Sequence, residues 1–407
     1  MLQQSHPTSD ERVILGAGAS RLAALLALAG VAALTIGGVL GWSRHDQFSY
    51  FLHSYLVSYV YILSIALGGL FFVASQHASR AGWSVTVRRL AEILSGTLPW
   101  LTVLFLPILL PTLLGSASLY PWADASAVSR DPQLQHKAAY LNLPFFGIRA
   151  VFYFAVWGLF ARYFLLRSRE QDRTGDFGLT LRMERVSPVA LILFALTITF
   201  ASFDWLMALE PHWFSTIYGV LYFSGSVVGG LAAMVVMAVV LQGTGRLSNS
   251  ITVEHYHDLG KLLLSFVIFW AYIAFSQYLL IWYANLPEET LWYQVRASGS
   301  WSKVAIILLV AHLFIPFLGL LSRYAKRRKF VLAFWSVWLL VVHWVDMYWL
   351  VMPTYSPHGA RPALLDAFCL AGLAAIFVAM ILWVAGEQAL SPQRDPRLAE
   401  SLAFENF

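Results

Sequence analysis

Cysteine is almost absent from this chain of 407 residues, which contains only Cys369, inside an apolar run. One thiol cannot form a disulfide within the chain. It also cannot supply a C-x-x-C-H haem attachment or ligate an iron–sulfur cluster. If the protein takes part in redox chemistry, other chains must therefore carry the metal centres, and we expect no redox cofactor in this one.

Charge is also scarce. Charged residues make up 12% of the chain and apolar residues 59%, whereas a soluble domain carries about 25% charge. The apolar residues fall in runs of roughly 20, long enough for a helix to cross the hydrocarbon core, and the alternating pattern of a membrane barrel is missing. The sequence predicts an all-α integral membrane protein with about ten spans. We place them at 22–42, 50–74, 85–114, 147–166, 186–209, 214–241, 260–285, 302–322, 330–352 and 362–386. The third is expected to begin as an amphipathic helix at 83–89.

No cleavable signal peptide is visible, because residues 1–21 are polar and include Asp10, Glu11 and Arg12. Segments on the same side as the N-terminus hold 19 of the 27 basic residues. The positive-inside rule therefore predicts a cytoplasmic N-terminal segment and a cytoplasmic tail at 387–407. Aromatic residues near the opposite span ends suggest an interfacial belt. Its members would be Trp205, Trp213, Trp282, Tyr283, Trp344 and Trp349.

A weak internal duplication is visible. Five residues of the second span recur in the sixth at an offset of 161: Ser54, Tyr61, Gly68, Gly69 and Leu70 match Ser215, Tyr222, Gly229, Gly230 and Leu231. Asp204 and Pro211 match Asp346 and Pro353 at an offset of 142. We interpret this as two parallel four-helix bundles, spans 2–5 (50–213) and spans 6–9 (214–361), with peripheral helices at 22–49 and 362–386. Chance is the alternative, because the shared patterns are short.

Two acidic residues inside spans are candidates for a proton path. A carboxylate in the bilayer interior costs about 2.5–3.5 kcal/mol on insertion scales and usually faces a bundle interior or a water path. Asp204 and Asp346 are such residues, and His343 shares a helix face with Asp346 because the two are three residues apart. An imidazole titrates near neutral pH and can pass protons. The alternative is that both carboxylates are wetted at the interface.

Other polar residues in the spans allow two readings. Glu92 follows Arg89 by three residues, so the two form either a helix-stabilising ion pair or the inner mouth of a proton path. His53 and His312 are lone histidines on apolar helices. Ordinary hydrogen-bonded histidines are the simpler reading, with haem ligation or the proton path as alternatives. His255 and His257 make only a weak metal signal, and we predict neither a metal site nor catalytic residues.

Three stretches carry a resemblance to a known family. They are 76–92 (with RAGWSV and RRLAE), 203–219 (with FDWLM and PHWFSTIYG) and 257–290 (with HDLGKLL, FSQY, IWYAN and PEET). Together they resemble the ActF-type membrane subunits of bacterial alternative complex III, a quinol:cytochrome c oxidoreductase. These subunits are similar to the NrfD and polysulfide-reductase membrane anchors. The resemblance covers about residues 20–385.

The resemblance implies ten helices in two four-helix bundles, in a bacterial inner membrane. It also implies partners: the homologous membrane subunit ActC, multihaem and monohaem c-type cytochromes, an iron–sulfur subunit and, in some assemblies, a terminal oxidase. Haem c and iron–sulfur clusters would lie in those partners. A quinone bound to this chain is left open. The family role is structural and proton-conducting rather than catalytic.

Two other functions compete with this one. A stand-alone secondary transporter would also suit ten helices in two repeats, although no span is strongly broken at mid-membrane. A quinone-reactive enzyme with haem b is not supported by the placement of the histidines. No P-loop, G-x-G-x-x-G or nucleophile elbow occurs in a supporting context.

Overall fold

The computed structural model describes residues 13–16 and 18–406. Within these ranges the chain forms helices and no strands, and ten helical segments are long and apolar enough to cross a membrane. The protein is an all-α, multi-pass integral membrane protein, as the sequence predicts. Boundaries differ from the predicted ones by a few residues in most spans and by up to nine at polar ends, where helices continue past the apolar run.

The helices that cross are long. They are α1 (Gly18–Trp42), α2 (Ser49–Ala78), α3 (Val85–Ser95) with α4 (Leu98–Leu104) and α5 (Leu106–Leu113), α8 (Leu143–Thr174), α9 (Phe177–Trp205) with η2 (Met207–Leu209), α10 (Tyr218–Gly243), α11 (Val253–Ala284), α13 (Gly299–Leu308) with the π-helix η3 (Leu309–Phe314) and α14 (Ile315–Leu321), α16 (Lys329–Tyr355) and α17 (Leu364–Ala385). Short helices fill the connections: η1 (Pro121–Ala123), α6 (Ala125–Arg130), α7 (Pro132–Lys137), α12 (Pro287–Arg296), α15 (Arg323–Arg327) and α18 (Leu398–Leu402).

The third span is interrupted twice. α3 ends before Gly96, and α4 and α5 each have a proline, Pro99 and Pro107, in their first turn. A proline lacks the N–H that would continue the ladder from the preceding turn, so helices restart at such residues. The predicted amphipathic start matches α3, but every residue of α3 is buried, because other parts of the chain cover its polar face.

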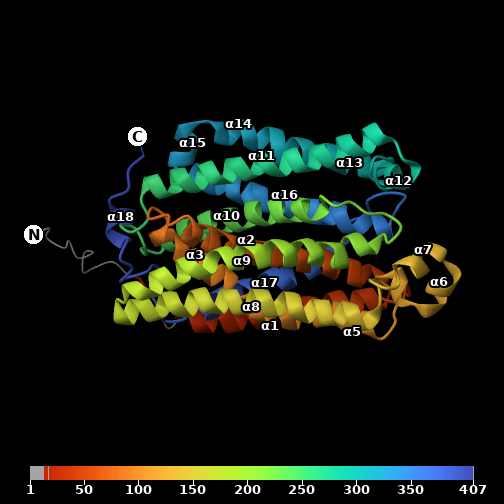
Figure 1. The fold of residues 1–407 in the computed structure, drawn as a ribbon, viewed down its shortest axis with the longest axis horizontal. Helices are drawn as coiled ribbons and strands as arrows, with labels where there is room; N and C mark the ends of the chain where they lie inside the picture. Colours follow the sequence, from red (N-terminus) through yellow and green to blue (C-terminus); the bar gives the residue numbers. More distant parts are fainter. Residues whose placement is uncertain (1–12, 17, 407) are drawn as a thin grey trace, which may run out of the picture.

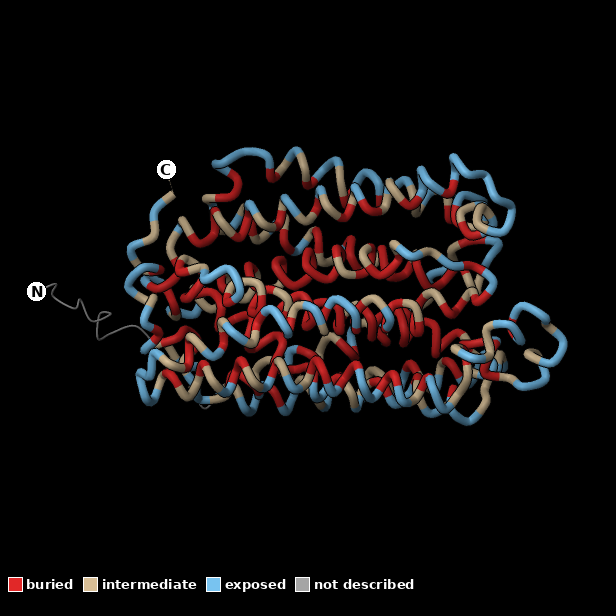
Figure 2. The backbone as a smooth tube through the Cα atoms, in the orientation of Figure 1, coloured by how far each residue is buried: buried red, intermediate tan, exposed pale blue. Residues whose placement is uncertain are grey.

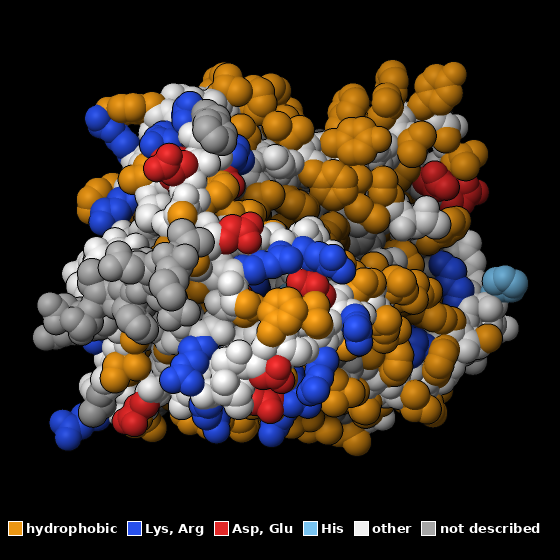
Figure 3. Space-filling model, turned by 60° about the vertical axis from the view of Figure 1, so that its left-hand side comes forward, with side chains coloured by type: hydrophobic (Ala, Val, Ile, Leu, Met, Phe, Trp, Pro, Cys, Tyr) orange, Lys and Arg blue, Asp and Glu red, His pale blue; other side chains and the backbone are white. Residues whose placement is uncertain are grey.

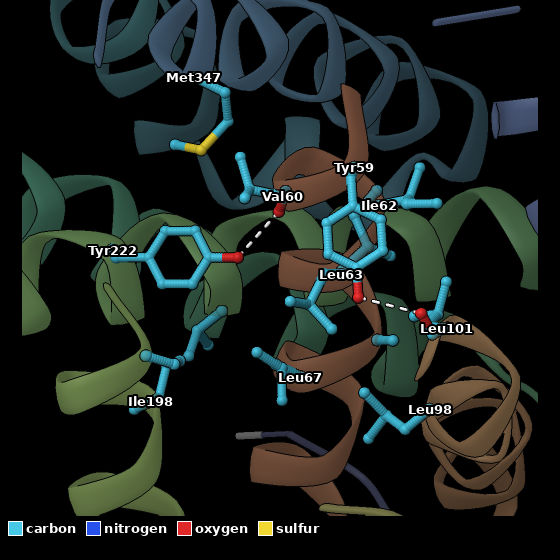
Figure 4. Close-up of a cluster of buried hydrophobic side chains, with 14 of the residues drawn as sticks. Tyr59, Val60, Ile62, Leu63, Leu67, Leu98, Leu101, Ile198, Tyr222 and Met347 are labelled. Carbon is cyan, nitrogen blue, oxygen red and sulfur yellow. Dashed lines mark hydrogen bonds between the residues drawn. The ribbon is translucent and has the colours of Figure 1, made fainter. Parts of the chain in front are cut away.

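Helix α2 is the axis of the bundle. The long helices lie side by side (Figure 1), and the buried residues concentrate along the middle of the molecule (Figure 2). Figure 4 shows how α2 is held: the Tyr222 hydroxyl of α10 donates to the Val60 carbonyl at 2.9 Å, and the Tyr59 hydroxyl donates to the Leu101 carbonyl of α4 at 3.0 Å. Two neighbouring helices are thus bonded directly to the central one.

Helices α2 and α10 cross where glycines meet. A Cβ added to Gly68 would lie 2.1 Å from the Ser226 carbonyl oxygen, and one added to Gly230 would lie 2.8 Å from Gly68. Small residues permit this backbone-to-backbone approach in membrane bundles. Gly68 and Gly230 belong to the glycine pairs related by the proposed duplication, so these pairs pack on each other. The duplication itself remains a prediction.

The bundle has two chemically distinct ends. We call the end with α6, α7 and α12 the α12 end and the opposite one the strap end. Lysine, arginine and acidic side chains gather at the strap end, beside a broad hydrophobic surface (Figure 3). The Leu390 N–H donates to the Val13 carbonyl at 2.7 Å, so the first described residue lies against residue 390 at this end. Which side of a membrane this end faces remains a prediction.

The predicted tail is bound to the bundle. Residues 389–406, here called the C-terminal strap, lie across the strap end. Asp395 pairs with Arg88 at 2.5 Å, the Ala389 carbonyl accepts from Arg89 at 2.9 Å, and the Ser401 hydroxyl donates to the Trp83 carbonyl at 2.6 Å. These bonds explain how the polar residues of α3 are buried.

Candidate functional site

Asp204 lies near the α12 end of α9 and is neutralised by an arginine. Arg149 of α8 donates from Nε to Oδ2 at 2.7 Å and from a terminal nitrogen to Oδ1 at 2.9 Å. The Tyr153 hydroxyl donates to Oδ2 at 2.8 Å. The Asp204 side chain is fully buried. A two-point arginine–carboxylate pair with a further hydrogen bond is the arrangement that best compensates a buried charge.

Asp346, its predicted counterpart, has no such partner. It is buried on α16, and the indole Nε1 of Trp270, on α11, donates to its Oδ2 at 3.0 Å. Within the ranges the structure describes, no lysine or arginine lies within ion-pair distance of it. The two aspartates therefore sit in chemically different environments.

His343 lies one turn from Asp346 and faces the same glycine, Gly225. The Ser64 hydroxyl donates to the Tyr61 carbonyl at 2.6 Å, so its oxygen accepts from His343 Nε2 at 2.7 Å. The proton is then on Nε2, and Nδ1, which has no partner, is a proton acceptor. A Cβ on Gly225 would lie 3.3 Å from Nδ1 and 3.8 Å from Asp346 Oδ2. Glycine at that position thus leaves room for both groups.

His312 completes this group. It lies in the π-helix η3, a distortion often found at functional sites. Its ring stacks on Trp270 with centroids 3.8 Å apart, and neither ring nitrogen has a partner among the described residues. We call Asp346, His343, His312, Trp270 and Ser64 the Asp346 cluster. Its carboxylate lacks a cation and its imidazole nitrogens lack partners among the described residues, so the cluster contains several groups that can bind a proton.

Glu92 and Arg89 form part of a buried network at the strap end. Glu92 accepts from Arg89 Nε at 2.9 Å and lies 3.5 Å from Arg88. Arg89 also donates to Asp172 at 2.7 Å. The ion pair that the sequence suggests is therefore present, and Asp395 of the strap extends it.

The remaining histidines lie apart from the Asp346 cluster. His53 Nδ1 donates to the Ser49 carbonyl at 2.8 Å near the α12 end of α2, and no contact in the described chain joins it to the cluster. His255 is hydrogen bonded to Thr252 and Ser401. No group of three or more potential metal ligands occurs among the described residues.

The α12 end also carries an ion pair between Glu210 and Arg296. The Glu210 carboxylate accepts from the buried Arg296 at 2.8 Å. Burial lowers the pKa of Arg296, and the Glu210 carboxylate opposes that shift. The guanidinium lies 3.6 Å from the centre of the Trp292 ring.

Several of these partners are missed by sequence reasoning. Arg149 is two residues inside the predicted fourth span, and Asp204 lies near the same side of the membrane in the next span. Opposite charges at similar depth on adjacent spans are a signal that could have paired them. Trp270 and Ser64 have no such signal. Two expected belt residues, Trp205 and Trp213, are buried in the core, whereas Trp282 and Tyr283 are exposed.

Comparison with known proteins gives no assignment: no family model matches the chain, and no curated protein matches it.

Proposed function

We propose that this membrane protein is a non-catalytic subunit of a quinol-oxidising electron-transfer complex, and that it moves protons through the Asp346 cluster. The complex would be of the alternative complex III type, in a bacterial inner membrane, with both termini cytoplasmic. Its partners would be ActC, the c-type cytochromes and the iron–sulfur subunit, which carry the haem and the clusters. Support for the assembly comes from the three resembling stretches and from the single cysteine.

One observation carries the proton role: Asp346 is buried in a spanning helix without a cation, beside two histidines with unpartnered nitrogens. A structural carboxylate in such a place would be expected to have a partner such as the one Arg149 gives Asp204. An unpaired carboxyl can instead hold a proton in one state and release it in another, and His343 Nδ1 is an acceptor on the same helix face.

The test of the proton role is Asp346→Asn in the assembled complex in vesicles. Asparagine keeps the acceptor for Trp270 but cannot carry a proton. We expect fewer protons released per electron, with quinol oxidation retained when a proton carrier collapses the gradient. His53→Gln, away from the cluster, is the matched control and should leave proton release unchanged. Intact assembly with unchanged release in Asp346→Asn would contradict the role.

The test of the assembly is purification in mild detergent, with haem staining and mass spectrometry. Co-purified c-type cytochromes and an iron–sulfur subunit are expected. A colourless single polypeptide in good yield would instead favour the secondary transporter.

A further inference from the structure

Gln277 is a buried amide without a partner inside a spanning helix. It lies on the same buried face of α11 as Trp270, two turns nearer the α12 end, and its side chain is 1% exposed. Neither Oε1 nor Nε2 has a hydrogen-bond partner among the described residues. Because a buried amide left unpaired costs free energy, such groups normally hold ordered water.

The neighbouring turn of α16 leads from Asp346 toward the same end. Trp349 and Leu350 follow Asp346 by three and four residues and so share its face. Arg296 donates to the Leu350 carbonyl at 3.0 Å and lies 5.7 Å from the Trp349 ring. Arg296 is therefore placed over the turn next to Asp346. Its partner Glu210 is 28% exposed, so this side leads to solvent.

Two more unpaired polar atoms occur along this route. Trp349 Nε1 and Arg296 Nε are buried and lack hydrogen-bond partners in the described chain. We call Gln277, Trp349 and Arg296 the polar column. Tyr293 of α12 lies beside it: burial raises the pKa of its hydroxyl, and the nearby Gln277 side chain opposes the shift, although the two groups form no hydrogen bond of normal geometry. The column thus extends from the turn of α16 that follows Asp346 to the α12 end.

We propose that ordered water fills the polar column and that Gln277 positions the water that takes the proton leaving Asp346 toward Glu210. This inference rests on the proposed proton role. The O–H bond of the Asp346 carboxyl breaks, the water oxygen accepts the proton, and the carboxylate stays hydrogen bonded to Trp270. Gln277 Oε1 accepts a hydrogen bond from that water. The Glu210 carboxylate offsets the charge of Arg296, which would otherwise repel the proton.

Gln277→Leu separates this role from a structural one. Leucine removes an amide that makes no protein hydrogen bond of normal geometry, so the unfolding temperature should fall less than in a variant that breaks such a bond. Gln171→Leu is the matched control, because Gln171 is equally buried but donates to Thr180 at 2.7 Å and to the Asp176 carbonyl at 3.1 Å. That variant should unfold at a lower temperature. In vesicles, Gln277→Leu should slow proton release several-fold, and Gln277→Glu should restore it.

A structure of the purified protein that resolves ordered water is expected to show water within hydrogen-bonding distance of the Gln277 amide. Absence of that water would overturn the inference. So would a Gln277→Leu variant that loses stability as Gln171→Leu does while proton release is unchanged. If Asp346→Asn alone slows proton release, only this inference fails. If neither variant slows it, the proposed function fails as well.

Discussion

Arg149 donates to both carboxylate oxygens of Asp204, at 2.7 and 2.9 Å, inside the spanning part of the bundle. Asp346, which occupies the corresponding place in the predicted duplication, receives one hydrogen bond from Trp270 instead. One carboxylate is thus paired with an arginine from a neighbouring helix, and the other has no such pair among the described residues. Under the proposed function, the pair provides a comparison within one chain between a structural acid and one that carries protons.

Asp204→Asn is expected to destabilise the protein strongly. It leaves the buried Arg149 without a counter-charge, and breaking one partner of a buried ion pair costs about 3–5 kcal/mol. Asp346→Asn should cost much less, because the asparagine oxygen still accepts from Trp270. Thermal unfolding of the two variants in the same detergent measures the difference.

The double variant Arg149→Met with Asp204→Leu serves as the control for that comparison. Removing both charges should recover most of the stability that Asp204→Asn loses. Equal unfolding temperatures for Asp204→Asn and Asp346→Asn would show that the Arg149 pair does not stabilise the bundle.

The crossing of α2 and α10 should not tolerate a single added methyl group. In Gly68→Ala the new Cβ would lie 2.1 Å from the Ser226 carbonyl oxygen, which is backbone and cannot rotate away. We expect a loss of about 1–3 kcal/mol or more, as for overpacked cores, measured by thermal unfolding. Gly243→Ala, on the same α10, meets nothing within 4 Å and should be neutral or stabilising. A stable Gly68→Ala protein would argue against the close crossing.

Cys369 should be inert toward thiol reagents until the protein unfolds. It is fully buried on α17, where it faces α1. A Cβ added to Gly37 of α1 would lie 3.8 Å from the Cys369 sulfur. Maleimide labelling followed by mass spectrometry should give no adduct in mild detergent and one adduct after denaturation. Rapid labelling of the native protein would mean that α1 separates readily from α17.

Acid should loosen the packing of residues 114–142 against the rest of the α12 end. His212 Nε2 lies 2.6 Å from Asp131 Oδ2, and this hydrogen bond lowers the pKa of the Asp131 carboxyl. A carboxyl with a lowered pKa in the folded state stabilises it above the unfolded value of about 3.9. That stabilisation is lost as the pH falls through the lowered pKa.

Deuterium exchange of residues 114–142, corrected for the intrinsic effect of pH, measures this loosening. His212→Phe should give somewhat faster exchange already at neutral pH, with little further change in acid, because an exposed pair contributes little to stability. Exchange that is equally slow in the wild-type protein at neutral pH and in acid would show that other contacts hold the segment. One such contact is the hydrogen bond from Trp122 to the Ala208 carbonyl.

The ten spans could be predicted because an apolar run of sufficient length leaves a chain no other way to satisfy its backbone in lipid. Which face of each span is buried could not be predicted. Trp205 and Trp213 were expected in the interfacial belt but are buried, because the sequence gives the depth of a residue and not its rotation about the helix axis. Trp282 and Tyr283 have the same depth signal and are exposed.

Asp346, His343 and His312 of the Asp346 cluster are among the residues that the sequence singles out, but their partners Trp270 and Ser64 are not. The other path candidates, Asp204, Glu92, Arg89 and His53, lie outside the cluster. Asp204 and Asp346 share an offset of 142 with Pro211 and Pro353, which suggests that the two aspartates are equivalent. A neighbouring helix nevertheless decides which of them receives an arginine. The π-helix that presents His312 also has no recognisable signature, since one extra residue in a turn depends on how α13 and α14 pack against α16.

Arg88 and Asp395 pair across 307 residues of sequence, which has a consequence for biosynthesis. Arg88 and Arg89 enter the bundle early, but the strap that covers them follows all ten spans. Before the strap is made, these arginines can contact Glu92 and, later, Ser168 and Asp172. A chain that stops before residue 389 would leave Arg88 without Asp395 and Arg89 without the Ala389 carbonyl. The strap therefore makes burial of the early arginines depend on synthesis of the last span, so that a truncated chain differs chemically from a complete bundle.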